Sequence, residues 1–409
     1  MTRRHVVVVG GGLVGLATAY AAVRAWPDGT ATVLEKEPGV ARHQSTHNSG
    51  VLHAGLSYAP GSLKARLATS GIARMVAFCE AHDIPHEICG KVVVAATAEE
   101  VPRLRAMMER GQRNGLEGLA WLSPEQLREI EPHVSGVAAV RVPAEGIVSY
   151  ARVAETLASC IAACGGRVMT NAAVYGIRRR RSARGSERGA AGWVLQTTAG
   201  DVEADLLINC AGLHSDRVAM MAGERPAVRV VPFRGEYYAL RAERRHLVRH
   251  LVYPVPDPAF PFLGVHFTRL VDGGVIAGPS AMLALAREGY RASTMALRDV
   301  AETCAFSGVW RFMARYPAMC WTELRQSMSR ELFAAALRRL VPELRTDDLT
   351  PAVAGVRAQA MRPTGELVQD FELLERPGAL HVINAPSPGA TASLAIGGEI
   401  VRRLSTQLD

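Results

Sequence analysis

The first 35 residues hold the feature that most restricts the fold. An apolar segment, His5–Val9, runs into the glycine-rich turn GGGLVG at residues 10–15, which satisfies the pattern G-x-G-x-x-G. An apolar helical pattern follows, and a second strand-like segment, Thr30–Leu34, ends on Glu35. In such a unit the glycines let the backbone approach a pyrophosphate, the helix N-terminus attracts the phosphates, and the acid accepts ribose hydroxyl groups. Residues 5–35 therefore predict a dinucleotide-binding unit.

The N-terminus also has some features of a secretion signal. Two arginines, Arg3 and Arg4, precede an apolar stretch that ends in small residues near Ala22. Glycines at positions 10–12 interrupt that stretch, and cleavage near Ala22 would remove the dinucleotide-binding pattern. We therefore expect this segment to be part of the folded protein.

The composition is typical of a globular protein with two domains. The 409 residues are 48% hydrophobic and 21% charged, and no segment has the roughly 18 consecutive apolar residues of a membrane-spanning helix. The net charge of +8 comes mostly from dispersed arginines, with one dense run at residues 178–181 beside a loop-like segment at 182–192. No nucleic-acid-binding motif accompanies this run, so we expect no nucleic-acid partner and instead a general attraction for anions or an acidic membrane surface.

The cysteines indicate a reducing compartment. There are seven of them, an odd number, and no two form a C-x-x-C pair. This pattern predicts neither disulfides nor a zinc site. We expect a cytoplasmic protein that holds no metal ion.

After Glu35 the chain does not continue directly into a doubly wound sheet. It enters a polar loop at residues 43–50, and nucleotide-type strands such as Leu206–Asn209 return only after residue 150. This interruption favours an FAD domain split by insertions over a nicotinamide dehydrogenase. We expect an α/β fold (α+β overall) in which a Rossmann-like FAD-binding domain is interleaved with a mixed-sheet substrate-binding domain. The FAD-binding domain would comprise residues 1–84, 146–228 and 350–409, and the substrate-binding domain residues 85–145 and 229–349.

Several long segments are similar to one family of flavin enzymes. The loop THNSGVLHAG at residues 46–55 resembles the second characteristic segment of the glycine/D-amino-acid oxidase class of FAD-dependent oxidoreductases. Within that class the chain resembles the L-2-hydroxyglutarate oxidases/dehydrogenases over almost its whole length, although residues 306–332 show only amphipathic helix. The segments that carry this resemblance are RHQSTHNSGVLHAGLSY (42–58), PGSLKA (60–65), GIVSY (146–150), PFRGEYY (232–238), YPVPDPA (253–259), PFLGVH (261–266), AGVRAQA (354–360) and NAPSPGAT (384–391).

The resemblance implies a two-domain FAD enzyme that oxidises L-2-hydroxyglutarate to 2-oxoglutarate. Electrons would pass to a quinone, another acceptor or oxygen, and peripheral contact with the inner face of the cell membrane and the oligomeric state stay open. Two alternatives also stay open. One is a related FAD oxidase or dehydrogenase of an amino acid or glycerol phosphate, and the other is a flavin-bound nucleic-acid-associated or scaffold protein.

An alcohol substrate requires a base, because the hydroxyl group loses a proton while a hydride leaves C2 for the flavin N5. Histidine suits this proton transfer near neutral pH. We expect His53, which follows the flavin-contacting loop, to be the base, with His266 after the apolar residues 261–265 as the second candidate. His43 and His47 are further candidates.

Two substrate carboxylates predict arginine ligands, since a guanidinium group binds a carboxylate through two parallel hydrogen bonds. Arg357, in GVRA, resembles the carboxylate-binding arginine of D-amino-acid oxidases. Arg234 lies between apolar and aromatic residues, and we expect it at the substrate or the flavin edge. Tyr58 and Tyr253 are expected to add hydroxyl contacts, and Lys64 is a weaker candidate.

The residues expected to hold FAD come from four glycine-rich or polar segments. They are Gly10, Gly12, Leu13, Val14, Gly15 and Glu35 for the ADP half, Lys36, Thr46, His47, Asn48, Ser49 and Gly50 along the phosphates and ring, Ala211 and Gly212 near the adenine, and Gly389, Ala390 and Thr391 near N1 and the C2 carbonyl. His47 matches the position at which some relatives attach the flavin covalently, and we expect non-covalent FAD.

Residues 310–340 combine aromatic and methionine side chains with arginines. We expect helices that pack on the substrate-binding domain. The alternative is an amphipathic element that lies on a membrane surface to reach a quinone.

Overall fold

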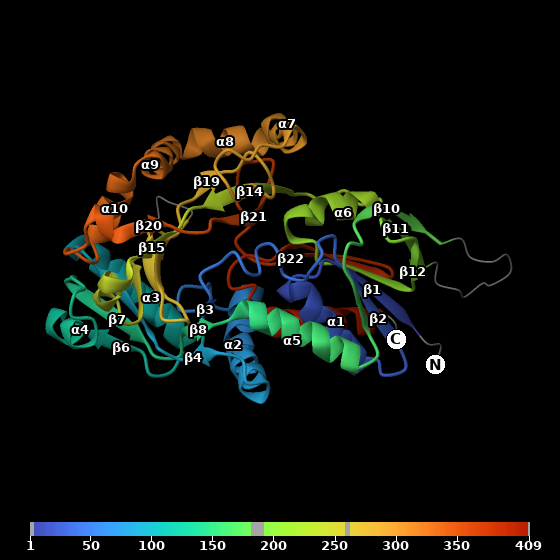
Figure 1. The fold of residues 1–409 in the computed structure, drawn as a ribbon, viewed down its shortest axis with the longest axis horizontal. Helices are drawn as coiled ribbons and strands as arrows, with labels where there is room; N and C mark the ends of the chain where they lie inside the picture. The colour runs from blue at the N-terminus through green and yellow to red at the C-terminus, as the bar shows by residue number, and fades with distance from the viewer. Residues whose placement is uncertain (1–3, 181–191, 258–261, 408–409) are drawn as a thin grey trace.

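A computed structural model describes residues 4–180, 192–257 and 262–407 of the chain. Two large sheets lie toward opposite ends of its long axis, and helices cover them (Figure 1). This mixed arrangement confirms the expected α/β, α+β class. Most of the loop-like segment at 182–192 and residues 258–261 of the family-like segments lie outside the described residues.

The N-terminal apolar run forms the middle of a six-stranded sheet. β1 (His5–Val9) pairs in parallel with β2 (Thr30–Leu34) on one side and with β13 (Leu206–Asn209) on the other. The order across the sheet is β22 (Glu372–Arg376), β23 (Ala379–Asn384), β13, β1, β2 and β9 (Arg167–Met169). Strands that follow residue 150 in the sequence, β13 among them, therefore complete the sheet that begins at residue 5, as the interrupted pattern predicts.

Both faces of this sheet are covered, which explains why Val6–Val9 of β1 are all apolar. Val6 and Val8 belong to the core beneath four helices, whereas Val7 and Val9 belong to the core on the opposite face. The helices are α1 (Leu13–Ala25), α2 (Leu63–Ala81), α5 (Tyr150–Ala163) and α11 (Ser393–Ser405). The opposite face carries α6 (Ser215–Met221) and the antiparallel strands β10 (Val174–Arg179), β11 (Trp193–Thr197) and β12 (Val202–Ala204).

The second large sheet has eight strands and mixed directions. Its order is β20 (Leu349–Pro351), β15 (Tyr238–Leu240), β18 (Val275–Gly278), β17 (His266–Arg269), β16 (Leu251–Pro254), β5 (Lys91–Ala95), β7 (Ala138–Val142) and β6 (Ala120–Leu122). Val92 and Val94 of β5 pack in one core with α4 (Pro124–Ile130) and α10 (Arg330–Arg338). Val93 packs on the other face beside α3 (Val101–Arg113), and the alternation along a strand places Lys91 on that same face.

Two small sheets and an arc of helices complete the fold. The small sheets are β19 (Met282–Leu283), β14 (Arg229–Gly235) and β21 (Gly355–Met361), and β3 (Val51–Leu52), β8 (Gly146–Val148) and β4 (His86–Glu87). Helices α7 (Leu297–Ala305), α8 (Ser307–Arg315), α9 (Pro317–Met328) and α10 follow one another along the outside (Figure 1). Phe312 and Met319 of this arc pack against Phe233 of β14. Among the described residues, no helix is both long and apolar enough to cross a membrane.

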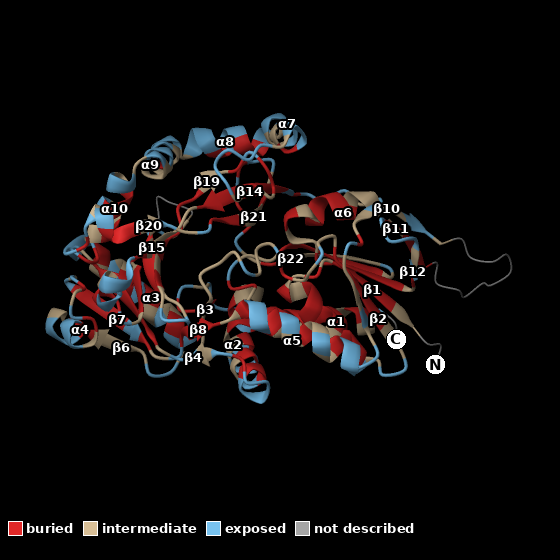
Figure 2. Cartoon of the chain, in the orientation of Figure 1, coloured by how far each residue is buried: buried red, intermediate tan, exposed pale blue. Residues whose placement is uncertain are grey.

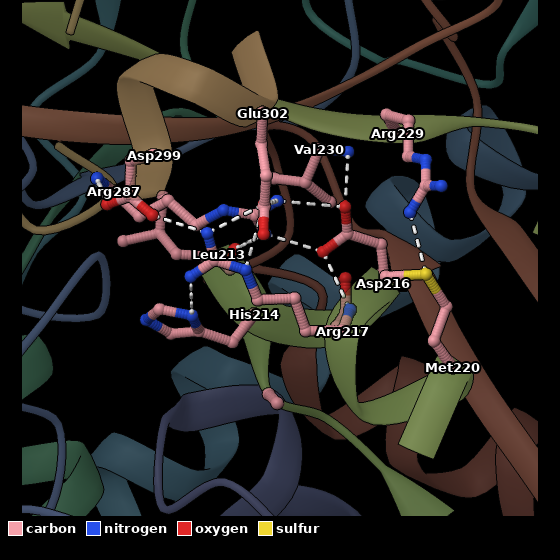
Figure 3. Close-up of polar contacts among 12 residues, drawn as sticks. Leu213, His214, Asp216, Arg217, Met220, Arg229, Val230, Arg287, Asp299 and Glu302 are labelled. Carbon is pink, nitrogen blue, oxygen red and sulfur yellow. Dashed lines mark hydrogen bonds and ion pairs between the residues drawn. The ribbon is translucent and has the colours of Figure 1, made fainter. Parts of the chain in front are cut away.

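A cluster of ion pairs connects α7 and the segment 284–296 to α6, which packs on the six-stranded sheet (Figure 3). Arg287 contacts Asp216 of α6, with 2.5 Å between Nη1 and Oδ1, and its backbone N–H donates to Asp299 of α7 at 2.7 Å. Arg217 pairs with Asp299 and with Glu302, the latter at 2.7 Å. The segment 284–296 is therefore held beside the loop that follows β13.

Candidate active site

A cavity of about 1010 Å³ runs from the start of α1 to the Lys91 face of the eight-stranded sheet. Most residues selected from the sequence line it. They are Gly10, Gly12, Leu13, Val14, Glu35, Lys36, His47, Asn48, Ser49, His53, Tyr58, Ala211, Gly212, Tyr253, His266, Arg357, Gly389, Ala390 and Thr391. Gly15, Thr46, Gly50 and Arg234 are not among the lining residues. The fold thus brings segments from both large sheets to one cavity.

The glycine turn has the geometry required of a pyrophosphate cradle. Gly10 has φ +109°, and a Cβ on Gly15 would lie 1.9 Å from the Gly10 carbonyl oxygen. Gly12 offers no side chain to cap helix α1, and the N–H of Leu13 donates to the hydroxyl of Ser45 at 2.9 Å, so an anion would meet the remaining backbone N–H groups of the first turn. Glu35 is buried at the end of β2 and accepts a hydrogen bond from the N–H of Gly11 at 2.7 Å. These residues fit the ADP half of a dinucleotide.

Thr46 and Gly50 do not line the cavity, but their hydrogen bonds and backbone conformation shape the loop at residues 43–50, which does. The hydroxyl of Thr46 donates to the Ala41 carbonyl at 2.6 Å. Gly50 has φ +69°, and its carbonyl accepts from the N–H of Val148 at 2.8 Å. Gly15 supports the cradle through close packing of helix on strand.

The segment 284–296 supplies a cavity residue that the sequence analysis did not select. Glu288 lies 2.8 Å from the ammonium of Lys36 and 2.7 Å from Nε2 of His214. Burial would raise the pKa of Glu288, but these neighbours lower it to about 2. Glu37, His43 and Glu288 are close enough together to share a cation, but the Lys36 ammonium already contacts both carboxylates. Lys36 therefore balances one of the two negative charges of this cluster.

At the other end of the cavity His53 lies beside a buried carboxylate. Nδ1 of His53 is 3.4 Å from Oε2 of Glu145, and the ammonium of Lys91 is 2.6 Å from the same oxygen. Glu145 is 0% exposed, whereas His53 and Lys91 both line the cavity. The backbone N–H of His53 donates to the hydroxyl of Thr391 at 3.2 Å, so the loop expected at the flavin ring adjoins the expected base.

His266 lines the same space in a less polar setting. Its ring lies 3.9 Å from that of Tyr253, and Nδ1 is 2.9 Å from the Gly264 carbonyl oxygen. Burial lowers the pKa of His266 to about 3. At neutral pH this ring is uncharged and a weak proton acceptor, so the geometry favours His53 over His266 as a base.

Arg357 and Arg234 lie on neighbouring strands but face opposite ways. In the β14–β21 ladder Arg357 pairs with Phe233, and Arg234 pairs with Val356 one residue along. Because side chains alternate along a strand, the two guanidinium groups lie on opposite faces of the ladder. Arg357 lines the cavity with no carboxylate within ion-pair distance among the described residues, whereas Arg234 lies 2.7 Å from Glu236. The structure therefore separates Arg234 from the cavity residues.

Two further lining residues come from the loop and helix after β3. The Lys64 ammonium lies 4.6 Å from the centre of the Tyr58 ring. Burial lowers the pKa of Lys64 to about 8, although Asp370 opposes this shift. Lys64 was a weaker candidate on sequence, and the fold places it in the cavity wall.

Sequence reasoning missed several polar residues of the site, namely Lys91, Arg103, Arg110, Glu145, Tyr237 and Glu288. For Lys91 a signal existed, because a lysine opens the otherwise apolar strand Lys91–Ala95. Glu145 has no comparable signal, since it sits in a turn where acids are common. Arg103 lies on a helix whose alternation of charged residues is typical of a solvent-exposed face.

Comparisons with known proteins identify the family of this chain. The model of a family described as FAD dependent oxidoreductase matches residues 5–403. An L-2-hydroxyglutarate dehydrogenase of Indibacter alkaliphilus is 46% identical over 97% of this chain and 97% of its own length. The L-2-hydroxyglutarate dehydrogenase of Escherichia coli K12 is 41% identical over 98% of this chain and 93% of its own length. The mitochondrial protein of the same name from Homo sapiens is 40% identical over 99% of this chain and 89% of its own length.

Solved structures show the same fold at lower identity. L-α-glycerophosphate oxidase of Mycoplasma pneumoniae, dithionite-reduced and with FAD bound, superposes with a TM-score of 0.78 at 22% identity, covering 99% of this chain and 95% of its own. Glycine oxidase of Geobacillus kaustophilus gives a TM-score of 0.72 at 20% identity, covering 98% and 95%. The chain belongs to the family of FAD-dependent oxidoreductases that includes the L-2-hydroxyglutarate dehydrogenases.

Proposed function

We propose that this protein oxidises L-2-hydroxyglutarate to 2-oxoglutarate with FAD as its cofactor. The observation that carries the proposal is a single cavity with a dinucleotide cradle at one end and His53, Lys91 and Arg357 at the other. Relatives 40–46% identical over nearly the whole chain bear the name of this activity.

The chain offers FAD a cradle that fits its phosphates and ribose. The glycine turn before α1 and the sterically restricted Gly15 suit the pyrophosphate, and Glu35 suits the ribose hydroxyls. The loop at residues 389–391 extends toward His53 and suits the isoalloxazine ring. Bound FAD would supply the hydride acceptor for C2 of the substrate.

In this proposal His53 removes the hydroxyl proton of the substrate. It faces the cavity while a buried carboxylate contacts its other side, the arrangement that prepares an imidazole as a base. Arg357 binds one substrate carboxylate through its guanidinium fork, and Lys91 offers a positive charge to the other. Tyr58 and Tyr253 complete the wall around the substrate.

We further propose that electrons leave for a quinone at an acidic membrane surface. Apolar side chains are unusually exposed along α7–α9, including Leu297 at 81%, Trp321 at 62% and Trp310 at 55%. Much of these helices is exposed (Figure 2), and arginines at positions 298, 311, 315 and 325 are among their exposed residues. Exposed aromatics with basic neighbours suit an anionic lipid surface. Glu323 of α9 influences the pKa of Arg357, so this helix adjoins the substrate end of the cavity.

The domain boundaries stay a prediction. The strand β21 belongs to the expected FAD-binding piece 350–409, and it pairs with β14 of the expected substrate-binding piece 229–349. We propose that the two domains meet at this ladder.

Anaerobic flavin reduction tests the function directly. The holoenzyme is mixed with L-2-hydroxyglutarate, its D-enantiomer, glutamate, glycine and glycerol phosphate, and the flavin absorbance is followed. We expect bleaching with the L-hydroxy acid and none with its enantiomer. Bleaching by glutamate, glycine or glycerol phosphate alone would assign a related activity, and salt-dependent RNA retention without any bleaching would favour a non-catalytic role. Reoxidation by oxygen and by a soluble quinone then identifies the acceptor.

A further inference from the structure

We propose that Glu145 is a positioning residue that fixes the tautomer of His53 and so prepares it as the base. The inference rests on the proposed function for the role of His53, and it concerns a residue that the substrate does not touch. Glu145 lies in the turn between β7 and β8, behind the cavity wall.

The carboxylate of Glu145 holds both the ring and the backbone around His53. Oε2 lies 3.4 Å from Nδ1 of His53, and Oε1 accepts a hydrogen bond from the N–H of Ala54 at 3.2 Å. Since Glu145 is 0% exposed, water does not compete for these contacts. The ring orientation is therefore set from behind, on the side away from the cavity.

Charge determines which nitrogen of the ring carries the proton. Burial would raise the pKa of Glu145, but Lys91 and His53 lower it to about 2, so the group is an anion at neutral pH. An ionised carboxylate has no proton to donate and can only accept a hydrogen bond. Oε2 of Glu145 has no hydrogen-bond partner among the described residues, so an Nδ1–H on the neutral imidazole is the tautomer that can satisfy it. That tautomer leaves the lone pair of Nε2 for the substrate hydroxyl.

Lys91 completes the arrangement. Its ammonium is 2.6 Å from Oε2 of Glu145 and 5.0 Å from the centre of the Tyr253 ring. Without the carboxylate, Lys91 would repel the imidazolium that forms when His53 takes up the proton. Tyr253, whose ring lies 6.3 Å away, and the uncharged His266 also face His53. Glu145 is thus the negative charge that stabilises protonated His53.

The chain contains a matched control elsewhere in the fold. Glu131 is also 0% exposed, and its Oε1 lies 2.8 Å from Nδ1 of His250. Neither residue lines the cavity. Replacing Glu131 by Gln therefore removes the buried carboxylate beside His250, a histidine that lies outside the cavity.

The test compares Glu145→Gln, Glu145→Asp and Glu131→Gln as holoenzymes. Nitrogen NMR of histidine-labelled protein, with the His53 signal assigned through His53→Gln, reports which ring nitrogen is protonated. Stopped-flow measurement of flavin reduction by L-2-hydroxyglutarate reports the rate and the substrate Kd separately. We expect Nδ1–H on His53 in the unaltered protein and in Glu131→Gln.

In Glu145→Gln the amide can donate to Nδ1, so we expect the proton to move to Nε2. Flavin reduction should then slow at least about tenfold with little change in substrate Kd, as when a group that orients a reacting histidine is removed. Glu145→Asp should restore part of the rate. If Glu145→Gln yields no holoenzyme, Glu145→Asp carries the test, because its shorter side chain lengthens the contact and should also slow reduction.

The proposal would be overturned if the Glu145 variants kept both the His53 tautomer and the flavin reduction rate of the unaltered protein. A failure of the proposed function looks different, since L-2-hydroxyglutarate would then leave the flavin of the unaltered protein oxidised. The tautomer of His53 still tests the role of Glu145 in that case, because its measurement needs no turnover.

Discussion

Arg287 and Asp216 are 71 positions apart in the chain, and they form a buried ion pair with 2.5 Å between Nη1 and Oδ1 (Figure 3). The pair joins the segment that carries Glu288 to the helix that follows β13. It therefore holds part of the cavity wall in place from outside the cavity.

Replacing Arg287 by Met should lower the free energy of unfolding by about 3–5 kcal/mol, because it leaves buried acids without their cation. Urea denaturation at a fixed FAD concentration measures this loss. The matched control is Arg152→Ala, which removes an exposed pair with Glu155 and should cost no more than about 0.5 kcal/mol. Equal losses in the two variants would contradict the structural role of Arg287.

Gly15→Ala should abolish FAD binding. The added Cβ would lie 1.9 Å from the Gly10 carbonyl oxygen, which forces helix α1 away from the turn. The flavin absorbance of the purified protein measures FAD content. Gly398→Ala in α11 is the control, because its Cβ would meet only the tip of Arg74 at 3.4 Å. That variant should keep its FAD and gain up to about 1 kcal/mol in stability. Full FAD content in Gly15→Ala would show that the cradle is misplaced.

Arg357→Ala should weaken binding of L-2-hydroxyglutarate by about 1.5–3 kcal/mol, the contribution of a hydrogen bond to a charged group. The substrate affinity of Arg357→Lys should lie between those of the unaltered protein and Arg357→Ala, since lysine keeps the charge but loses the planar fork. The substrate Kd from anaerobic flavin reduction measures both. Arg362→Ala, just beyond the end of the same strand and outside the cavity, serves as the control. An unchanged Kd in Arg357→Ala would remove this residue from the substrate site.

The acid stability of the protein should depend on Glu145. Its pKa is lowered from 4.5 in an ordinary glutamate to about 2 in the folded protein. A lowered folded-state pKa stabilises the native state above pH 4.5, and this stabilisation is lost as the pH falls toward 2. The shift corresponds to about 3 kcal/mol.

Measurement of the unfolding free energy between pH 6 and pH 3 checks this prediction. The unaltered protein should lose more stability over this range than Glu145→Gln, which lacks the titrating group. Parallel curves for the two proteins would show that Glu145 does not carry the lowered pKa.

Vesicle binding tests the face formed by α7–α9. The double variant Trp310→Ser and Trp321→Ser should sediment less with vesicles that contain anionic lipid, because both indoles are more than half exposed. Tyr175→Ser is the control, since Tyr175 is 61% exposed but lies on β10 of the other sheet system. Equal sedimentation of the double variant and the unaltered protein would rule out this face as the membrane contact.

The sequence predicts the dinucleotide cradle because its geometry is local. Gly10, Gly15 and Glu35 lie within one strand–turn–helix–strand unit, where spacing along the chain fixes spacing in space. The interruption after Glu35 also predicts correctly that later strands complete the same sheet, because an apolar strand such as Leu206–Asn209 needs two covered faces.

The reacting end of the site could not be predicted in the same way. Lys91, Glu145 and His53 come from three separate segments, and only the pairing of β3 with β8 and of β5 with β7 brings them together. Arg234 is a residue that the sequence suggested for the site but that the fold places outside the cavity lining. Its sequence setting resembles that of a functional arginine, but the alternation of side chains along β14 turns it toward Glu236 and away from the cavity.

The sequence by itself therefore determined the fold class and the family, and it predicted where an FAD cradle would lie. Each of these rests on residues close together in the chain or on long segments shared with relatives. Only the tertiary structure decided which polar side chains share the cavity, which of the two histidines has a carboxylate behind it, and which of the two arginines lines the cavity. These are contacts between distant segments, and strand register and side-chain direction fix them.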